Sequence, residues 1–440
     1  MGIFFGTDGL RGRVNTELTS EVATKCGNAL CSLKDRPKIV IGRDTRVSGC
    51  LISTAFALGA IDAGAEIIDV GICPTAGIAY LTQTLMADFG VVISASHNSS
   101  EYNGIKIFDK NGYKLSDKNE ENVERNFIKT IYATHPNFGH LTYQPELVSQ
   151  YIEHLKSCVF APLDGLKVVI DCSNGASYSI APEVYNRLGC DVKVIHNDSC
   201  GININDNCGS LYPSSLIKNV LDNKADIGFA FDGDSDRIVA VDSKGLIYNG
   251  DMILYILSTY LKENNKLNSN TVVGTSHTNM GIEKALINKG ITLIRSDIGD
   301  KYVLEKILSH KLSLGGEQSG HIIIKEKAST GDGILTSLIL SSIICKTKKS
   351  LSELFDVKLF PQANINIPVN DKIRIINSEK LTDSITREHE ILGKDSRVLV
   401  RASGTEDKIR IMIENESLDV ATQSAERIAL IVKQISLGNE

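Results

Sequence analysis

Short apolar runs that stop abruptly in polar residues recur along this 440-residue chain, and they constrain its fold more than any other feature. Examples are KIVIGRD, VVISASHN, LKVVIDCSNGA and DIGFAFDGDSDR. Such runs are typical of buried parallel strands leaving a sheet. Segments between them, such as GCLISTAFALGAIDAGA and APEVYNRLG, have helical spacing. The alternation predicts an α/β protein, whose ligands bind where the strands leave the sheet.

The alternation restarts near Leu166 and again near Gly250, and its character changes after about Pro361. A chain of this length usually divides into several domains. We therefore expect three related α/β domains with mixed, largely parallel sheets, followed by a smaller C-terminal α+β domain. The expected bounds are residues 1–150, 151–249, 250–358 and 359–440.

Composition and charge narrow the possible partners. The net charge of −6 gives no basic surface, which argues against nucleic acid. The longest apolar stretch, GILTSLILSSIIC, is too short and too rich in serine to span a bilayer, so we expect no membrane partner. The ten cysteines contain no C-x-x-C pair, and the first residues lack the pattern of a signal peptide. These features favour reduced, buried thiols and a cytoplasmic location.

The segment DGDSDR places Asp232, Asp234 and Asp236 within five residues, directly after an apolar run. Three such carboxylates repel one another unless a cation neutralises them, and oxygen ligands suit Mg²⁺. A calcium loop would need Gly and Glu at its sixth and twelfth positions, which here are Arg237 and Ser243. A solvated acidic loop is the alternative, but the preceding apolar run favours a metal site.

Two further loops carry groups suited to a sugar phosphate. RASGT, residues 401–405, combines a guanidinium, two hydroxyls and a glycine that permits close backbone approach, which together suit an anion. GGEQSGH, residues 315–321, places a carboxylate, an amide and a hydroxyl between glycines, which suit sugar hydroxyls. Composition alone leaves ordinary turns open for both loops. The arginines of GTDGLRG and GRDTRVSG have two possible roles: they bind phosphate, or they form ion pairs with the neighbouring aspartates. For Arg43 and Arg46 the ion pair is favoured.

The serine-rich exit VVISASHNSS does not fit an ordinary nucleophile. There is no G-x-S-x-G elbow, and adjacent side chains of an extended segment point apart, so Ser96 and His97 are poorly placed as a nucleophile and its base. The chain also has no P-loop. What remains is a serine that carries a phosphoryl group beside a metal.

Taken in order, SASHN, DGDSDR, GEQSGH and RASGTE resemble the signature loops of the α-D-phosphohexomutases. FGTDGLRG, NGIKIF and TGDGI match as well, and the resemblance runs from Phe5 to about Glu414. It implies four domains around a central cleft, each giving one loop to it. It also implies that Ser96 carries the phosphoryl group and that one Mg²⁺ per chain is bound by Asp232, Asp234, Asp236 and a phosphate oxygen on Ser96.

The resemblance implies roles for the other loops too. Proton transfer and charge stabilisation would fall to Lys106 and His321. Arg11 and Arg237 would lie near the transferring phosphoryl group, and His97 would orient the loop or contact that group. The substrate-binding residues would be Glu317, Ser319, Arg401, Ser403, Gly404, Thr405 and Arg410.

Within the family, Gln318, GININ with CGSLYP, and IGDKYVLE resemble the glucosamine branch. The expected reaction is the interconversion of glucosamine 6-phosphate and glucosamine 1-phosphate through glucosamine 1,6-bisphosphate, a step towards UDP-N-acetylglucosamine and peptidoglycan. A phosphomannomutase/phosphoglucomutase of the same family is the alternative. A homodimer formed through the first domain is the oligomeric state that the resemblance suggests. Lys301, Asp407 and Lys408 depart from the usual pattern, but none replaces a catalytic group.

Two alternative functions lie outside the family. A phosphatase of the haloacid dehalogenase type would use an aspartyl nucleophile in D-x-D-x-[TV], but Asp236 occupies the fifth position here. A non-catalytic sugar-phosphate-binding protein would have little reason to place three carboxylates beside a serine.

Overall fold

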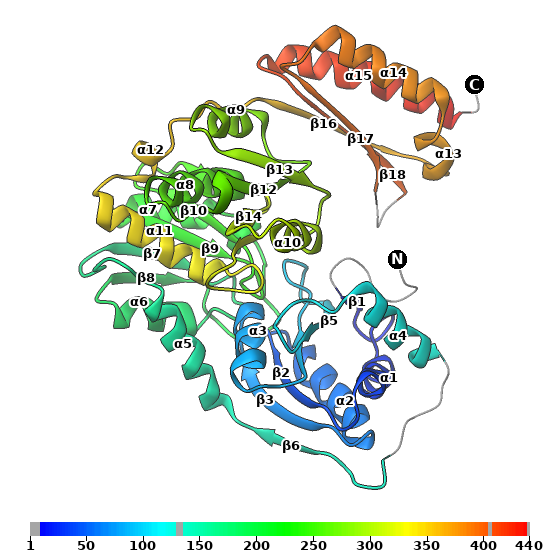
Figure 1. Cartoon of the computed structure of the whole chain (residues 1–440), viewed down its shortest axis with the longest axis vertical. Coiled ribbons are helices and arrows are strands. Elements are labelled where there is room, and N and C mark those ends of the chain that lie inside the picture. The colour runs from blue at the N-terminus through cyan, green and yellow to red at the C-terminus, as the bar shows by residue number, and fades with distance from the viewer. Residues whose placement is uncertain (1–8, 129–134, 404–406, 438–440) are drawn as a thin grey trace. The chain divides into compact units, whose positions relative to one another are not determined.

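The computed structural model describes residues 9–128, 135–403 and 407–437. The chain forms two compact units, one of Met1–His277 with Gly290–Asp356 and one of Thr278–Lys289 with Val357–Glu440. The first unit holds three sheets (Figure 1). Each unit is described by itself.

The first sheet has the order β1-β5-β4-β2-β3-β6. Its strands are β1 (Leu10–Arg13), β2 (Lys38–Arg43), β3 (Glu66–Ile72), β4 (Phe89–Ile93), β5 (Tyr102–Asp109) and β6 (His140–Tyr143). The strands β2, β3, β4 and β6 pair in parallel, whereas β5 is antiparallel to both β1 and β4. The helices are α1 (Ser20–Leu30), α2 (Ser48–Asp62), α3 (Thr75–Thr84), α4 (Asp117–Ile128) and α5 (Val148–Ser157), with short 3₁₀ turns η1 (Cys31–Leu33) and η2 (Pro145–Leu147).

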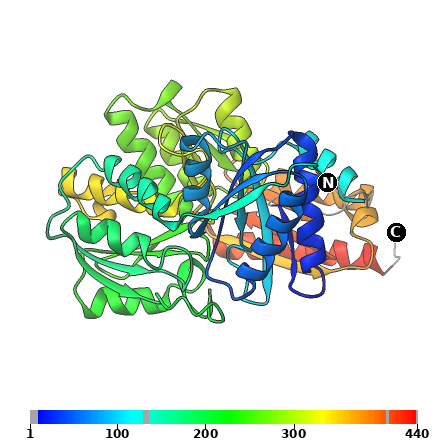
Figure 2. The same ribbon diagram turned by 90° about the horizontal axis from the view of Figure 1, so that it is seen from below.

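Helices α1 and α2 pack unusually closely, side by side in Figures 1 and 2. A Cβ atom on Gly27 would lie 2.0 Å from the Phe56 carbonyl oxygen, and one on Gly59 would lie 1.9 Å from the Thr24 carbonyl oxygen. Only glycine allows the two backbones to approach so closely. The pair closes a core in which Ile39, Ile41 and other strand residues are fully buried, and this core supports the strand β4 that leads to Ser96.

The second sheet has the order β11-β10-β9-β7-β8. Its elements are β7 (Lys167–Asp171), α6 (Ile180–Arg187), β8 (Asp191–Ile195), η3 (Gly209–Leu211), α7 (Ser214–Asp222), β9 (Ile227–Phe231), β10 (Ile238–Asp242) and β11 (Ile247–Tyr248). Strand β7 pairs in parallel with β8 and β9, so all three strands end at one edge of the sheet. The polar exit of β9 therefore lies at the edge where α/β proteins bind ligands.

The third sheet has the order β13-β12-β14-β15. Its elements are α8 (Gly250–Glu263), η4 (Asn268–Asn270), β12 (Thr271–Thr275), β13 (Thr292–Ser296), α10 (Asp300–Ser309), β14 (Leu314–Gly316), β15 (Ile322–Ile324), α11 (Gly333–Thr347) and α12 (Leu351–Leu354). Side chains begin two of these helices: Asn249 accepts a hydrogen bond from the Met252 N–H, and Asp332 accepts one from the Leu335 N–H. The three mixed sheets confirm the predicted α/β class.

The second unit contains an antiparallel sheet of order β16-β18-β17, with α14 and α15 on one face (Figure 1). Its elements are α9 (Met280–Asn288), β16 (Gln362–Pro368), α13 (Lys372–Ile376), α14 (Glu379–Leu392), β17 (Arg397–Ala402), β18 (Lys408–Glu414) and α15 (Leu418–Ser436). The separate antiparallel sheet and its helices confirm the predicted α+β character of the smaller C-terminal domain. Helix α9 joins this unit, because Asn279 exchanges two hydrogen bonds with the Phe360 backbone and Glu414 accepts one from the Met280 N–H.

Candidate active site

Ser96 lies just beyond the end of β4 in a strained and tightly held loop. Its φ is +52°, a left-handed conformation that is costly for a residue with a side chain, and such strain is typical of functional positions. The hydroxyl of Ser94 donates to Asp44 and accepts from the Ser96 N–H at 2.9 Å. The guanidinium of Arg46 donates to the carbonyls of Ser96 and Asn98. Ser94 and Arg46 therefore shape the loop, and Arg46 also forms the expected ion pair with Asp44 at 2.9 Å.

The three aspartates leave β9 in a tight loop and are all buried. One oxygen from each of Asp232, Asp234 and Asp236 lies within 4.8 Å of the others. The Ser96 hydroxyl donates a hydrogen bond to Asp232 Oδ2, and Thr75 donates one to Asp234 Oδ2 at 2.5 Å. The sequence therefore correctly predicts that the serine loop and the acidic loop meet.

The acidic loop fits a hard divalent cation. The Oδ1 atoms of Asp234 and Asp236 are buried and accept no hydrogen bond, and a buried carboxylate oxygen without a partner is costly unless a cation binds it. Burial and the charges of Asp236 and Asp234 raise the pKa of Asp232 to about 8. In contrast, Lys106 and other partners outweigh burial and hold the pKa values of Asp234 and Asp236 below their usual range.

Cationic side chains face the acidic loop from β1 and β5. The antiparallel register pairs Arg11 with Gly104, which places Arg11 and Lys106 on the same face of the sheet. Lys106 Nζ lies 2.7 Å from Asp234 Oδ2 and 3.1 Å from Asp236 Oδ2. Burial opposes its charge, but these carboxylates raise the pKa of Lys106, so the ammonium stays protonated in the metal-free protein.

Two further predicted residues lie beside this group. Arg237 directly follows the acidic loop, and its Nε is 4.0 Å from Asp236 Oδ1. Burial, followed by the charges of Arg237 and Arg11, lowers the pKa of His97 to about 4. An imidazole with this pKa is a weak base at neutral pH, which supports the prediction that His97 does not activate Ser96.

The GEQSGH loop joins β14 to β15, and its Gly320 contacts Ile238, the first residue of β10 and the second residue after Asp236. The Ile238 N–H donates to the Gly320 carbonyl at 3.1 Å, and a Cβ on Gly320 would lie 2.0 Å from the Ile238 carbonyl oxygen. Glu317 is buried and accepts from the Gly299 N–H at 3.0 Å, whereas Ser319 is exposed. The loop therefore offers a rigid carboxylate and an accessible hydroxyl.

His321, the last residue of this loop, is buried between two acidic side chains. Its Nδ1 is 3.7 Å from Asp236 Oδ2 and its Nε2 is 3.7 Å from Asp300 Oδ2. Burial opposes a positive charge, but the carboxylate of Asp236 raises the pKa of His321. The Gly331 N–H donates to Nε2 at 3.0 Å, an arrangement that places the proton of the neutral ring on Nδ1.

The RASGT loop belongs to the second unit. Arg401 and Arg410 are directly opposite each other on β17 and β18. Two like charges at such a position repel, which favours an anion between them. Burial and Arg410 lower the pKa of Arg401. Ser403 is buried, and its N–H donates to the Lys408 carbonyl at 2.9 Å.

Gly404 and Thr405 lie outside the described residues, so their predicted roles stay predictions. Two of the residues that depart from the family pattern, Asp407 and Lys301, form ion pairs. Asp407 forms an ion pair with Lys372 at 3.4 Å, and Lys301 pairs with Asp117.

Several supporting residues were missed by the sequence analysis. Thr75 bonds Asp234 from the start of α3, and Asn205 donates to the carbonyls of Ser96 and Asn98 at 2.8 and 2.9 Å. Lys114 pairs with Asp300 beside His321. These contacts join residues that are far apart in the sequence. Only Thr75 had a local signal, because it stands at the start of a predicted helix.

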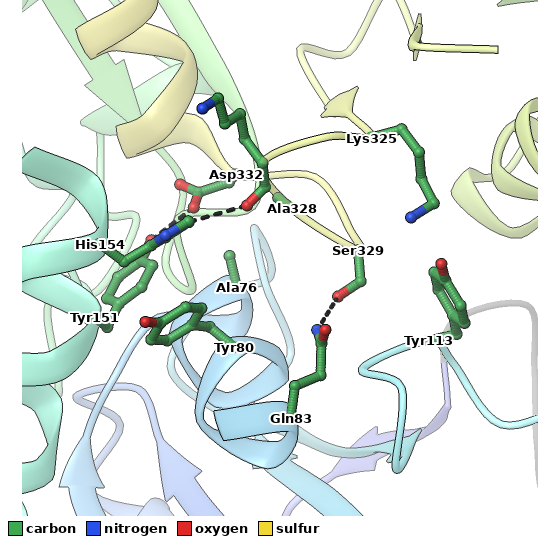
Figure 3. Close-up of a pocket in the computed structure, with 11 residues that line it drawn as sticks. Ala76, Tyr80, Gln83, Tyr113, Tyr151, His154, Lys325, Ala328, Ser329 and Asp332 are labelled. Carbon is green, nitrogen blue, oxygen red and sulfur yellow. Dashed lines mark hydrogen bonds between the residues drawn. The ribbon is translucent and has the colours of Figure 1, made fainter. Parts of the chain in front are cut away.

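The TGDGI segment lies at a separate pocket of about 210 Å³ (Figure 3). The Tyr151 hydroxyl donates to Asp332 Oδ2 at 2.8 Å, and the Tyr80 ring stacks on His154 at 4.4 Å between centroids. Burial raises the pKa of Asp332 to about 6. Asp332 of this motif therefore begins α11 and lines the pocket. The rest of the motif contacts the candidate active site, because the Gly331 N–H donates to His321 Nε2 and the Gly333 N–H donates to the Ser235 carbonyl at 2.9 Å.

Comparison with known proteins decides the family. Models of phosphoglucomutase/phosphomannomutase α/β/α domains I, II and III match residues 2–133, 149–245 and 249–360, and the C-terminal domain model matches residues 365–431. The chain belongs to this α-D-phosphohexomutase family. The family domains follow the predicted order, and the exact domain bounds stay predictions.

Curated relatives agree over the full length. The chain is 43% identical over 445 residues to a phosphoglucosamine mutase of Clostridium novyi, covering 99% of both proteins. It is also 43% identical over 448 residues to a phosphoglucosamine mutase of Corynebacterium jeikeium, covering 99% of this chain and all of the relative. The resemblance to the glucosamine branch is thereby confirmed.

Solved structures share the fold. A phosphoglucomutase/phosphomannomutase family protein from Burkholderia thailandensis has a TM-score of 0.84 at 22% identity, with 97% of each chain covered. An N-acetylphosphoglucosamine mutase from Aspergillus fumigatus, solved with GlcNAc-6P and magnesium, has a TM-score of 0.64 at 19% identity over 90% of this chain and 83% of that one. Within the described residues of this chain, no helix is both long and apolar enough to cross a membrane.

Proposed function

We propose that the chain interconverts glucosamine 6-phosphate and glucosamine 1-phosphate as an intramolecular phosphotransferase. The observation that carries this proposal is the contact between Ser96 and the buried aspartate loop, because a phosphoryl carrier next to a cation site is what the reaction needs. The full-length identity to curated phosphoglucosamine mutases supports the amino sugar as the substrate.

The reaction begins with phosphorylated Ser96. The hydroxyl O1 of glucosamine 6-phosphate attacks the phosphorus, the bond from phosphorus to Ser96 Oγ breaks, and a new bond to O1 forms. The O1 proton passes to a base, for which Lys106 and His321 in their neutral forms are the candidates, and the departing Ser96 oxygen takes up a proton to become a hydroxyl. The product is glucosamine 1,6-bisphosphate, which must then present its other phosphate. Transfer of the O6 phosphoryl group back to Ser96 leaves glucosamine 1-phosphate and restores the starting enzyme.

Asp232, Asp234 and Asp236 would hold one Mg²⁺, because their carboxylates converge and the Oδ1 atoms of Asp234 and Asp236 accept no hydrogen bond. When bound, Mg²⁺ neutralises charge on the transferring phosphoryl group. Lys106, Arg11 and Arg237 supply positive charge from the protein itself.

Glu317 and Ser319 would bind the sugar, and the described part of the RASGT loop would bind the phosphate that does not react. Arg401 and Arg410 suit that role because each guanidinium can hold two phosphate oxygens. Gly404 and Thr405 are proposed to complete the phosphate site. We place the reaction in the cytoplasm because all ten cysteines are free thiols. A homodimer through the first domain remains a prediction.

Rates on glucosamine, glucose and mannose 6-phosphates test the substrate. We expect kcat/KM to be highest for glucosamine 6-phosphate, and an equal or higher value for glucose or mannose would overturn this assignment. Substrate labelled in its phosphate tests the reaction class. We expect an alkali-stable serine phosphate on Ser96, whereas an alkali-labile aspartyl phosphate would contradict the mechanism.

A further inference from the structure

Asp171, His196 and Cys208 form a second group of metal-ligating side chains in the described part of the chain, outside the candidate active site. One ligand atom from each residue lies within 4.8 Å of the other two. Asp171 ends β7, and His196 directly follows β8, which pairs in parallel with β7 and places Ile195 opposite Asp171. Cys208 directly precedes the short turn η3. The fold therefore brings together three segments that are separate in the sequence.

One of these ligand atoms, His196 Nδ1, has no hydrogen bond of good geometry. Asp171 is fully buried, and its carboxylate accepts from the Ser173 N–H at 2.9 Å and from the Gly209 N–H at 3.1 Å. His196 Nδ1 lies 3.0 Å from Asp171 Oδ2, but this buried nitrogen has no hydrogen bond of proper alignment. The His196 side chain is 29% exposed, so the group can be reached from solvent.

We propose that Asp171, His196 and Cys208 bind a borderline divalent cation of the zinc type, with water as the fourth ligand. An oxygen, an imidazole nitrogen and a thiolate sulfur are the ligands that Zn²⁺ prefers, whereas Mg²⁺ prefers oxygen alone. Tetrahedral zinc bonds of about 2.0–2.3 Å place ligand atoms roughly 3.3–3.8 Å apart. The Asp171 and His196 atoms, 3.0 Å apart, would widen slightly, and any ligand atoms near the 4.8 Å limit would draw closer, so the group needs only small shifts to reach that geometry.

A metal ion must compete with protons for the ligand atoms of Cys208 and His196, so its binding depends on pH. Burial raises the pKa of the Cys208 thiol to about 12, so the metal must displace a proton to bind the sulfur. The contact with Asp171 raises the pKa of His196, whose Nδ1 must also be free of its proton. Metal binding at this site therefore releases protons.

A cation here would act on the candidate active site through Asn205. This residue lies between His196 and Cys208 and donates to the carbonyls of Ser96 and Asn98. A metal that joins the ends of β7 and β8 to Cys208 restrains the segment carrying Asn205. The bound cation thus stabilises the support of the Ser96 loop without taking part in phosphoryl transfer.

Cobalt is the sharpest probe, because a thiolate ligand gives Co²⁺ a near-ultraviolet charge-transfer band that oxygen ligands do not give. Co²⁺ is added to the full-length protein in excess Mg²⁺, which occupies the aspartate loop. We expect the band to saturate at one Co²⁺ per chain and to disappear in Cys208→Ser. The band should weaken at least tenfold in His196→Gln at the same Co²⁺ concentration.

Cys200→Ser is the matched control, because Cys200 is an exposed thiol in the same segment but outside the group. The control should keep the band. A protein without the band, a band that survives in Cys208→Ser, or a band lost equally in Cys200→Ser would overturn the proposal. Thermal unfolding gives a second measurement: Zn²⁺ should raise the midpoint of the wild type and of Cys200→Ser but not that of His196→Gln. An equal rise in all three would also overturn it.

Discussion

The hydroxyl of Ser96 donates a hydrogen bond to the carboxylate of Asp232, although 136 residues separate them in the sequence. Ser96 follows β4 of the first sheet and Asp232 follows β9 of the second. Because both side chains are buried, the contact fixes the serine oxygen beside the acidic loop. A phosphoryl group on that oxygen would lie next to the cation site, and this juxtaposition links the two loops in one reaction.

Replacement of Ser96 by alanine should abolish the mutase reaction while leaving the fold intact. The change removes the only atom that carries the phosphoryl group in the proposed mechanism. We expect kcat to fall to background and no label to be transferred to the protein, with an unchanged circular dichroism spectrum. Ser99→Ala is the matched control, because Ser99 is an exposed serine of the same loop. Substantial activity in Ser96→Ala would contradict the assignment.

Lys106→Met should lower kcat but increase the stabilisation of the protein by Mg²⁺. The ammonium neutralises Asp234 and Asp236, so its removal leaves two buried carboxylates without the cation that they share. We expect kcat to fall by about 10²–10⁴-fold. The free energy of unfolding without metal should fall by about 3–5 kcal/mol.

Addition of Mg²⁺ should raise the thermal midpoint of Lys106→Met more than that of the wild type, because the cation replaces the lost charge. Lys110→Met is the control, since Lys110 is an exposed lysine just beyond the same strand. Equal stabilisation by Mg²⁺ in wild type and Lys106→Met would refute the idea that the ammonium and the cation neutralise the same carboxylates.

The variant His321→Gln tests whether His321 transfers a proton or only orients Asp236. Glutamine can still accept the hydrogen bond that Gly331 donates to His321 Nε2, but it cannot exchange a proton at neutral pH. If His321 transfers a proton, kcat should fall by about 10²–10⁴-fold with little change in the KM for the sugar phosphate. Retention of most of the activity would show instead that His321 only orients Asp236.

The sequence allowed much of this site to be predicted, and the exceptions have a physical reason. The strand exits at Ser96 and Asp232 were recognisable because an apolar run and a polar turn are local features of the chain. The support from Thr75, Asn205 and Asp300 was not predicted, because hydrogen bonds between distant segments leave no periodic signal. The same reason hid Asp171, His196 and Cys208, which come together only through the parallel pairing of β7 and β8. Likewise, the association of α9 with the C-terminal unit depends on tertiary contacts of Asn279.

Asp332 should make the protein less stable as the pH rises from about 4 to about 6. Burial raises the pKa of this carboxyl from 3.8 to about 6, so the folded protein retains a proton that the unfolded chain has already lost. Ionisation therefore favours the unfolded chain across this window, by on the order of 3 kcal/mol in total. Above about pH 6 both states are ionised and the penalty is constant.

The variant Asp332→Asn isolates this effect, because asparagine cannot ionise but can still accept the hydrogen bond that begins α11. The free energy of unfolding, measured in urea at a series of pH values, should fall for the wild type relative to Asp332→Asn between about pH 4 and pH 6. The two curves should then run parallel at higher pH. Asp371→Asn, which alters an exposed helix-capping aspartate, is the matched control. If the wild type and Asp332→Asn run parallel throughout, then the buried carboxyl is ionised at no cost, and the hydrogen bonds that it accepts, including those from Leu335 and Tyr151, are sufficient to stabilise its charge.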